Sequence, residues 1–94
     1  MVNLKYSAME VKEITLEIIK KNGFRRLIAR QYVLPMVDKE IYVCIASIEG
    51  LPNTNGTWLV AIKNGYTDAK IAITYAHELQ QALTLCGVDK TIEV

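Results

Sequence analysis

The chain has 94 residues, of which 51% are hydrophobic and 22% charged, and its formal net charge is +1. This length suits one domain with a small core, and the composition excludes an intrinsically disordered protein. No apolar run approaches the roughly 18 residues that span a bilayer, and the polar first thirteen residues are unlike a secretory signal. We therefore expect a single cytoplasmic domain over residues 1–94, with no membrane segment.

The first expected element is a helix over residues 7–22. Ser7 begins an S-x-x-E capping box, and Ile14 and Ile18 recur at the spacing of one helical face. Gly23 is expected to end the helix, because glycine adopts the left-handed conformation of that position without a steric penalty.

Three strands are expected to follow, over residues 24–34, 41–48 and 58–63. Pro35 ends the first strand, because proline has no N–H to donate to a sheet. The segment 49–57 (EGLPNTNGT) is long for a hairpin, so it is either a contact loop for a protein partner or a plain connector.

A second helix is expected over residues 67–86, with Thr67 as its N-cap and Gly87 just beyond its end. Its alanines, isoleucine and leucines follow the 3.6-residue period. Residues 2–5 and 91–94 could add short edge strands at the two ends of the chain.

These elements predict an α+β domain of two layers, with the order αβββα. Consecutive strands with short loops pair antiparallel, which gives a three-stranded sheet with both helices on one face. The strands over 41–48 and 58–63 carry apolar side chains on both faces, so the face without helices would expose an apolar patch. Soluble monomers seldom expose such a patch, and a second copy in a twofold dimer is its commonest cover.

Charge is unevenly distributed along the chain. Between Ile18 and Val37 there are five basic residues and no acidic one, so the rest of the chain carries a net negative charge. Such a segment can bind nucleic-acid phosphates, but it can equally be a solvated or interface surface. The basic residues are Lys20, Lys21, Arg25, Arg26 and Arg30.

No enzyme is expected, because no catalytic or nucleotide-binding motif is present. His77 is the single histidine, and Cys44 and Cys86 lie in apolar contexts typical of small, reduced core residues. We therefore expect no catalytic residues, no metal ligands and no cofactor.

The sequence favours a small binding or adaptor protein that acts through protein–protein contacts as a homodimer. Its expected partner-binding site is the uncovered sheet face with a basic rim: Tyr32, Tyr42, Trp58, Arg26 and Arg30. The alternative is a nucleic-acid-binding module that uses Lys20, Lys21, Arg25, Arg26 and Arg30, with aromatic side chains to stack on bases.

Overall fold

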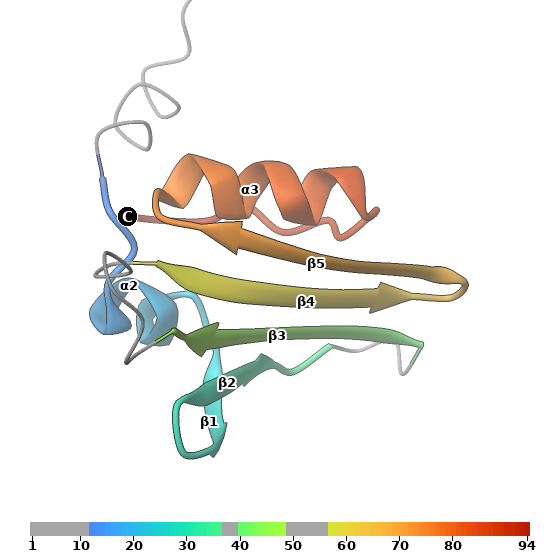
Figure 1. Ribbon diagram of the computed structural model, residues 1–94. Helices are drawn as coiled ribbons and strands as arrows, with labels where there is room; N and C mark the ends of the chain where they lie inside the picture. Colours follow the sequence, from blue (N-terminus) through green and yellow to red (C-terminus); the bar gives the residue numbers. More distant parts are fainter. Residues whose placement is uncertain (1–11, 37–39, 49–56) are drawn as a thin grey trace, which may run out of the picture.

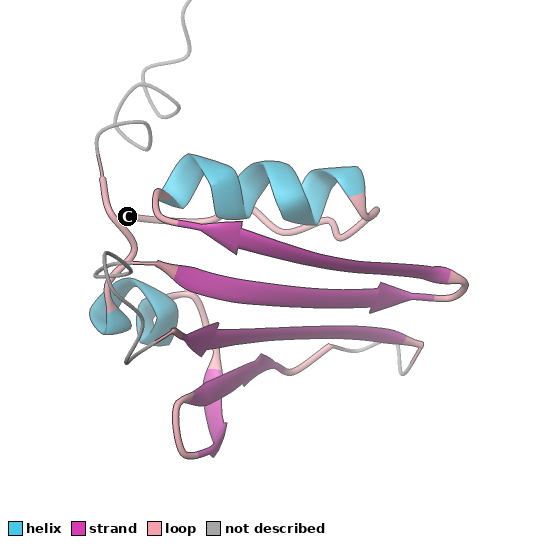
Figure 2. Cartoon of the chain, in the orientation of Figure 1, coloured by secondary structure: helices cyan, strands magenta, loops and turns pink. Residues whose placement is uncertain are grey.

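An antiparallel sheet of five strands, with two helices, makes up the computed structural model, which describes residues 12–36, 40–48 and 57–94 (Figures 1 and 2). The strands follow one another across the sheet in chain order, as a meander. The α+β class is confirmed, whereas the three-stranded sheet and the αβββα order are wrong. The elements are α2 (Leu16–Lys21), β1 (Arg25–Ile28), β2 (Gln31–Leu34), β3 (Ile41–Ser47), β4 (Trp58–Asn64), β5 (Thr67–Ile73) and α3 (Ala76–Leu85).

The helix α2 begins later than expected, at Leu16, because residues 12–14 are held extended against the start of α3. The N–H of Ile14 donates to the carbonyl of Thr74 at 2.9 Å. Thr15 then caps the helix, its Oγ1 accepting from the N–H of Ile18 at 3.2 Å. The predicted helix is therefore wrong over 12–15, and its capping box lies outside the described residues.

The single strand expected over 24–34 is a hairpin, with β1 and β2 joined at Ala29 and Arg30. Ala29 has a positive φ of 39°, which is uncommon for a residue other than glycine. The turn is held from two sides: Arg26 Nε donates to the carbonyl of Ala29 at 3.1 Å, and Ser47 N–H donates to that of Arg30 at 3.2 Å. One of these bonds is local and the other comes from β3, and together they hold a turn that contains no glycine, proline or asparagine.

The largest difference from expectation is β5, which occupies the first third of the predicted second helix. A two-residue turn at Gly65 and Tyr66 reverses the chain, and seven residue pairs then join β4 to β5. Gly65 has a φ of +60°, a conformation that glycine adopts freely in such hairpin turns. The helix α3 starts only at Ala76, so Thr67 is not its N-cap.

Both helices end as predicted, with glycine followed by an apolar residue. The N–H of Phe24 donates to the carbonyl of Ile19 at 3.2 Å, and that of Val88 to Leu83 at 2.8 Å. With positive φ at Gly23 and Gly87, both ends form the Schellman motif, which turns the chain back into the core.

The C-terminal segment 88–94 forms no strand, so the edge strand expected at 91–94 is wrong. It is held instead by two side-chain amides. Gln80 Oε1 accepts from Ile92 N–H at 2.7 Å, while its Nε2 donates to the carbonyl of Lys90 at 2.9 Å. Asn22 binds Glu93 in the same way, so the segment ties α2 to α3. The expected strand at 2–5 lies outside the described residues.

The two faces of the sheet differ in what covers them. One face meets side chains of both helices, and we call it the helix-covered face; its buried residues include Leu34, Val43, Ile45, Val60 and Ile62. Successive side chains along a strand alternate between faces, and ladder partners share one. Among the described residues, no helix is long and apolar enough to cross a membrane.

Candidate functional site

The other face, which we call the open face, carries the side chains that alternate with the core residues. No described helix packs on it. The ladder register assigns to it Arg25, Ile28, Gln31, Val33, Tyr42, Cys44, Ala46, Leu59, Ala61, Lys63, Asp68, Lys70 and Ala72.

The middle of the open face is apolar. Ala46 pairs with Leu59 and Ala61 pairs with Cys44, while the exposed Tyr42 pairs with Lys63 at one end and Ile28 lies on the edge strand β1, beyond Gln31. Ile28 is 60% exposed and Leu59 37% exposed. Contiguous exposed apolar surface rimmed by polar residues is typical of contact sites for other proteins.

Polar residues surround this apolar centre, and most are cationic. Three basic side chains, Arg25, Lys63 and Lys70, stand against one carboxylate, Asp68. All four are exposed. The open face is thus an apolar surface with a net positive rim.

Tyr42 and Cys44 interact on the open face, two residues apart on β3. A hydrogen bond to Cys44, with partial burial as a smaller cause, raises the pKa of Tyr42 above its ordinary value. Tyr42 therefore stays neutral well above physiological pH and presents an uncharged ring to a partner.

Two predicted site residues are not on the open face. Trp58 and Tyr32 are only 8% and 9% exposed, within the core beneath the helices. The indole Nε1 of Trp58 donates to the carbonyl of Ile14 at 3.3 Å. The prediction that they lie on the open face is wrong. Alternation along each strand places Trp58 on the same face as Val60, and Tyr32 on the same face as Leu34, which is the helix-covered face.

The predicted basic residues are divided between surfaces. Arg25 is on the open face, whereas Arg26 pairs with Tyr32 and so projects from the helix-covered side. Arg30 lies in the hairpin turn. Lys21 is on α2, where its Nζ donates to the carbonyl of Val94 at 3.1 Å. Tyr42 alone of the five predicted partner-binding residues combines an exposed ring with a place on the open face.

The groups that could perform chemistry are separate from one another. Cys44 and Cys86 are free and buried, as the sequence indicates. His77 stacks on Tyr75, with ring centroids 6.0 Å apart, and its Nδ1 is buried without a hydrogen-bond partner among the described residues. Within 12–36, 40–48 and 57–94, no three His, Cys, Asp or Glu side chains gather to hold a metal ion.

Sequence reasoning missed Ile28 and Leu59, the two large aliphatic residues of the open face. For Leu59 the signal was present, because it alternates with the buried Val60. For Ile28 it was absent, since a bulge between Arg26 and Ile28 shifts the register of β1.

Comparison of the chain with protein-family models, with curated proteins and with solved structures found no match.

Proposed function

We propose that the chain is a small non-enzymatic binding protein that acts through protein–protein contacts and assembles as a homodimer. The observation that carries the contact with a partner protein is the open face: its central strands carry Cys44, Ala46, Ala61 and the exposed Leu59, and no described helix packs on it. Burial of such a surface by another protein removes apolar area from water, which favours association.

The charge of the rim favours a different protein over a second copy as the occupant of the open face. Two copies packed face to face would bring together two surfaces that each carry three cations, Arg25, Lys63 and Lys70, against one carboxylate, Asp68. Like charges at an interface oppose association. A partner with an acidic rim around an apolar centre fits better, so the contact between copies needs a separate surface.

The proposal is tested by comparing what the tagged chain retains from an extract of its source cells. Leu59→Asp and Tyr42→Asp each place a charge on the open face. Leu16→Asp is the control, because it places a charge at a similarly exposed site on α2. We expect a defined protein to bind the wild type and Leu16→Asp and to be lost from both open-face variants. Retention that is equal for all four proteins would contradict the open face as the contact surface.

A further inference from the structure

The two edges of the sheet are protected to different degrees. An exposed edge strand can pair with another chain, and natural proteins block this with short strands, bulges and charged residues. β1 has all three: four residues, a bulge after Arg26, and two arginines. β5 has seven residues, pairs with β4 without a bulge, and has no strand on its outer side among the described residues.

The register shows which peptide groups of β5 face outward. The two-residue turn closes on the Asn64–Thr67 pair, so alternate residues from Thr67 onward bond to β4. The peptide groups of Asp68, Lys70 and Ala72 therefore point away from the sheet. Thr74 is next in this outward row, and it is satisfied: its N–H donates to Glu78 Oε1 at 3.0 Å, and its carbonyl accepts from Ile14.

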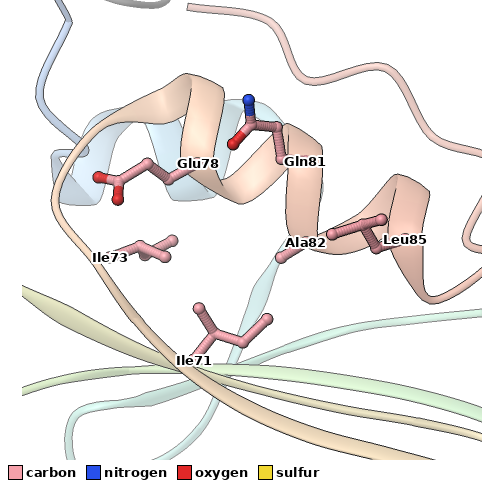
Figure 3. Close-up of a pocket in the computed structure, with 6 residues that line it drawn as sticks. All are labelled: Ile71, Ile73, Glu78, Gln81, Ala82 and Leu85. Atoms are coloured by element: carbon pink, nitrogen blue, oxygen red, sulfur yellow. The ribbon is translucent and has the colours of Figure 1, made fainter.

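An apolar hollow of about 140 Å³ runs beside this edge, between β5 and α3 (Figure 3). Ile71 and Ile73 rise from β5 toward the helix, and Ala82 and Leu85 lie above them (Figure 3). Leu85 is 82% exposed. A strand added to β5 would gain hydrogen bonds from the edge.

We propose that β5 pairs antiparallel with β5 of a second copy, centred on Ala69, and that this contact forms the homodimer of the proposed function, on which the inference rests. In this register, Asp68 of each copy lies opposite Lys70 of the other, so the twofold axis generates two opposite-charge pairs. The outward peptide groups of Asp68 and Lys70 then bond across the interface.

The neighbouring registers are less favourable. A shift by one pair centres the contact on Lys70 and places two ammonium groups opposite each other. A further shift, centred on Ile71, pairs Asp68 with Thr74, whose peptide groups are already bonded. Of these registers, the one centred on Ala69 places opposite charges together and uses backbone groups that bond to no other described residue.

The helix layer is compatible with this arrangement. Asn64 Nδ2 donates to the carbonyl of Cys86 at 2.8 Å, which places the C-terminal end of α3 near the start of β5. The adjacent, exposed Leu85 lines the hollow with Ile71, two residues along β5 from Ala69, so the helix layer leaves the edge strand accessible. The two open faces lie on the same side of the joined sheet, since the axis is perpendicular to it.

The test is sedimentation equilibrium of the full chain with variants of β5. Lys70→Glu replaces both attractive pairs by repulsive ones, and we expect the dimer to weaken about tenfold. The swap Asp68→Lys with Lys70→Glu reverses both charges, and Lys63→Glu is added because Lys63 lies opposite residue 68 on β4; this triple variant should restore the dimer to within about threefold of the wild type. Lys20→Glu, an exposed change on α2, is the control and should leave it unchanged.

Amide exchange measured by NMR gives a second readout. Raising the protein concentration should slow exchange at Asp68 and Lys70, while Ala69 and Ile71, already bonded to β4, stay protected throughout. Two results would overturn the proposed edge contact: amide exchange rates at Asp68 and Lys70 that do not change with protein concentration, or a Lys70→Glu variant that dimerises as strongly as the wild type.

The failures of the two proposals are distinguishable. A dimer that ignores Lys70→Glu but dissociates with Leu59→Asp would place the second copy on the open face and overturn only the edge contact. A chain that remains monomeric would overturn the dimer as well, and it would leave the hollow beside β5 to an extended segment of another protein. Loss of a bound partner with Leu59→Asp, in either case, would still support the open face.

Discussion

Asn22 binds both peptide groups of Glu93: its Nδ2 donates to the Glu93 carbonyl at 2.7 Å, and its Oδ1 accepts from the Glu93 N–H at 2.7 Å. The same Nδ2 also donates to the carbonyl of Ile18 at 2.8 Å. Asn22 is itself buried and follows directly on α2. One side chain thus caps a helix and anchors the C-terminal segment 71 residues away.

Asn22→Ala should lower the free energy of unfolding by about 1–2 kcal/mol, because it leaves the two partly buried peptide groups of Glu93 without their partner, while the Ile18 carbonyl keeps the backbone N–H of residue 22. Urea denaturation followed by circular dichroism measures the loss. The control is Lys21→Ala, which removes an exposed contact to Val94 and should cost less than about 0.5 kcal/mol. Equal effects of the two variants would show that the amide does not anchor the segment.

Gln80 and Gln81 offer a matched pair on α3. Gln80 is buried and bonds to both Lys90 and Ile92, whereas Gln81 is exposed. We expect Gln80→Ala to destabilise the fold by about 2 kcal/mol and Gln81→Ala by less than about 0.5 kcal/mol. Thermal melts of the two variants make the comparison, and a similar melting temperature for both would contradict it.

Replacement by aspartate should change the stability of the fold by very different amounts at Trp58 and at Tyr42. Trp58→Asp should cost more than about 4 kcal/mol, because it removes a core aromatic residue and buries a carboxylate. Tyr42→Asp, on the open face, should stay within about 1 kcal/mol of the wild type. Near-ultraviolet circular dichroism separates the cases: a folded Trp58→Asp variant would contradict the core position of the indole.

The raised pKa of Tyr42 has a consequence at alkaline pH. A folded-state pKa above the unfolded value of 10.0 means that the native chain holds its proton longer. Stability is therefore full below pH 10 and falls as the pH rises through the folded-state pKa. Absorbance titration at 295 nm, wild type minus Tyr42→Phe, should give a midpoint above 10.0, and Cys44→Ala should lower it. A midpoint at or below 10.0 would show that the contact is not formed.

The nucleic-acid hypothesis remains a prediction with its own test. It requires the wild type to shift DNA or RNA in a mobility assay at low salt, and Arg26→Glu with Arg30→Glu to remove that shift. A wild type that shifts neither nucleic acid would contradict it. The five basic residues are divided over α2, the hairpin turn and both sheet faces, and this division favours a wild type that shifts neither DNA nor RNA.

The sequence predicted those parts of the fold that local chemistry determines. Gly23 and Gly87 end both helices, and the alternation in β4 separates its buried side chains from its more exposed ones. What it could not predict depends on distant contacts. Ala29–Arg30 is a turn because Ser47 bonds to it, and no turn residue marks it in the sequence.

That residues 67–73 form the strand β5 could not be predicted, for a related reason. Ala69 and Ile73 fit one helical face, but Ala69, Ile71 and Ile73 also fit one face of a strand. The hairpin with β4 decided between the two, since seven ladder pairs outweigh helix propensity. The predicted site failed at Trp58 and Tyr32 because alternation separates the two faces without saying which one the helices cover.

The homodimer is tested most directly by light scattering from the purified chain, over a range of protein concentrations and at two salt concentrations. A mixed pool of DNA and RNA is added to half of the samples. The account predicts a molar mass of two chains that nucleic acid does not change. A mass of one chain at every concentration, or one that rises only with nucleic acid at low salt, would contradict it.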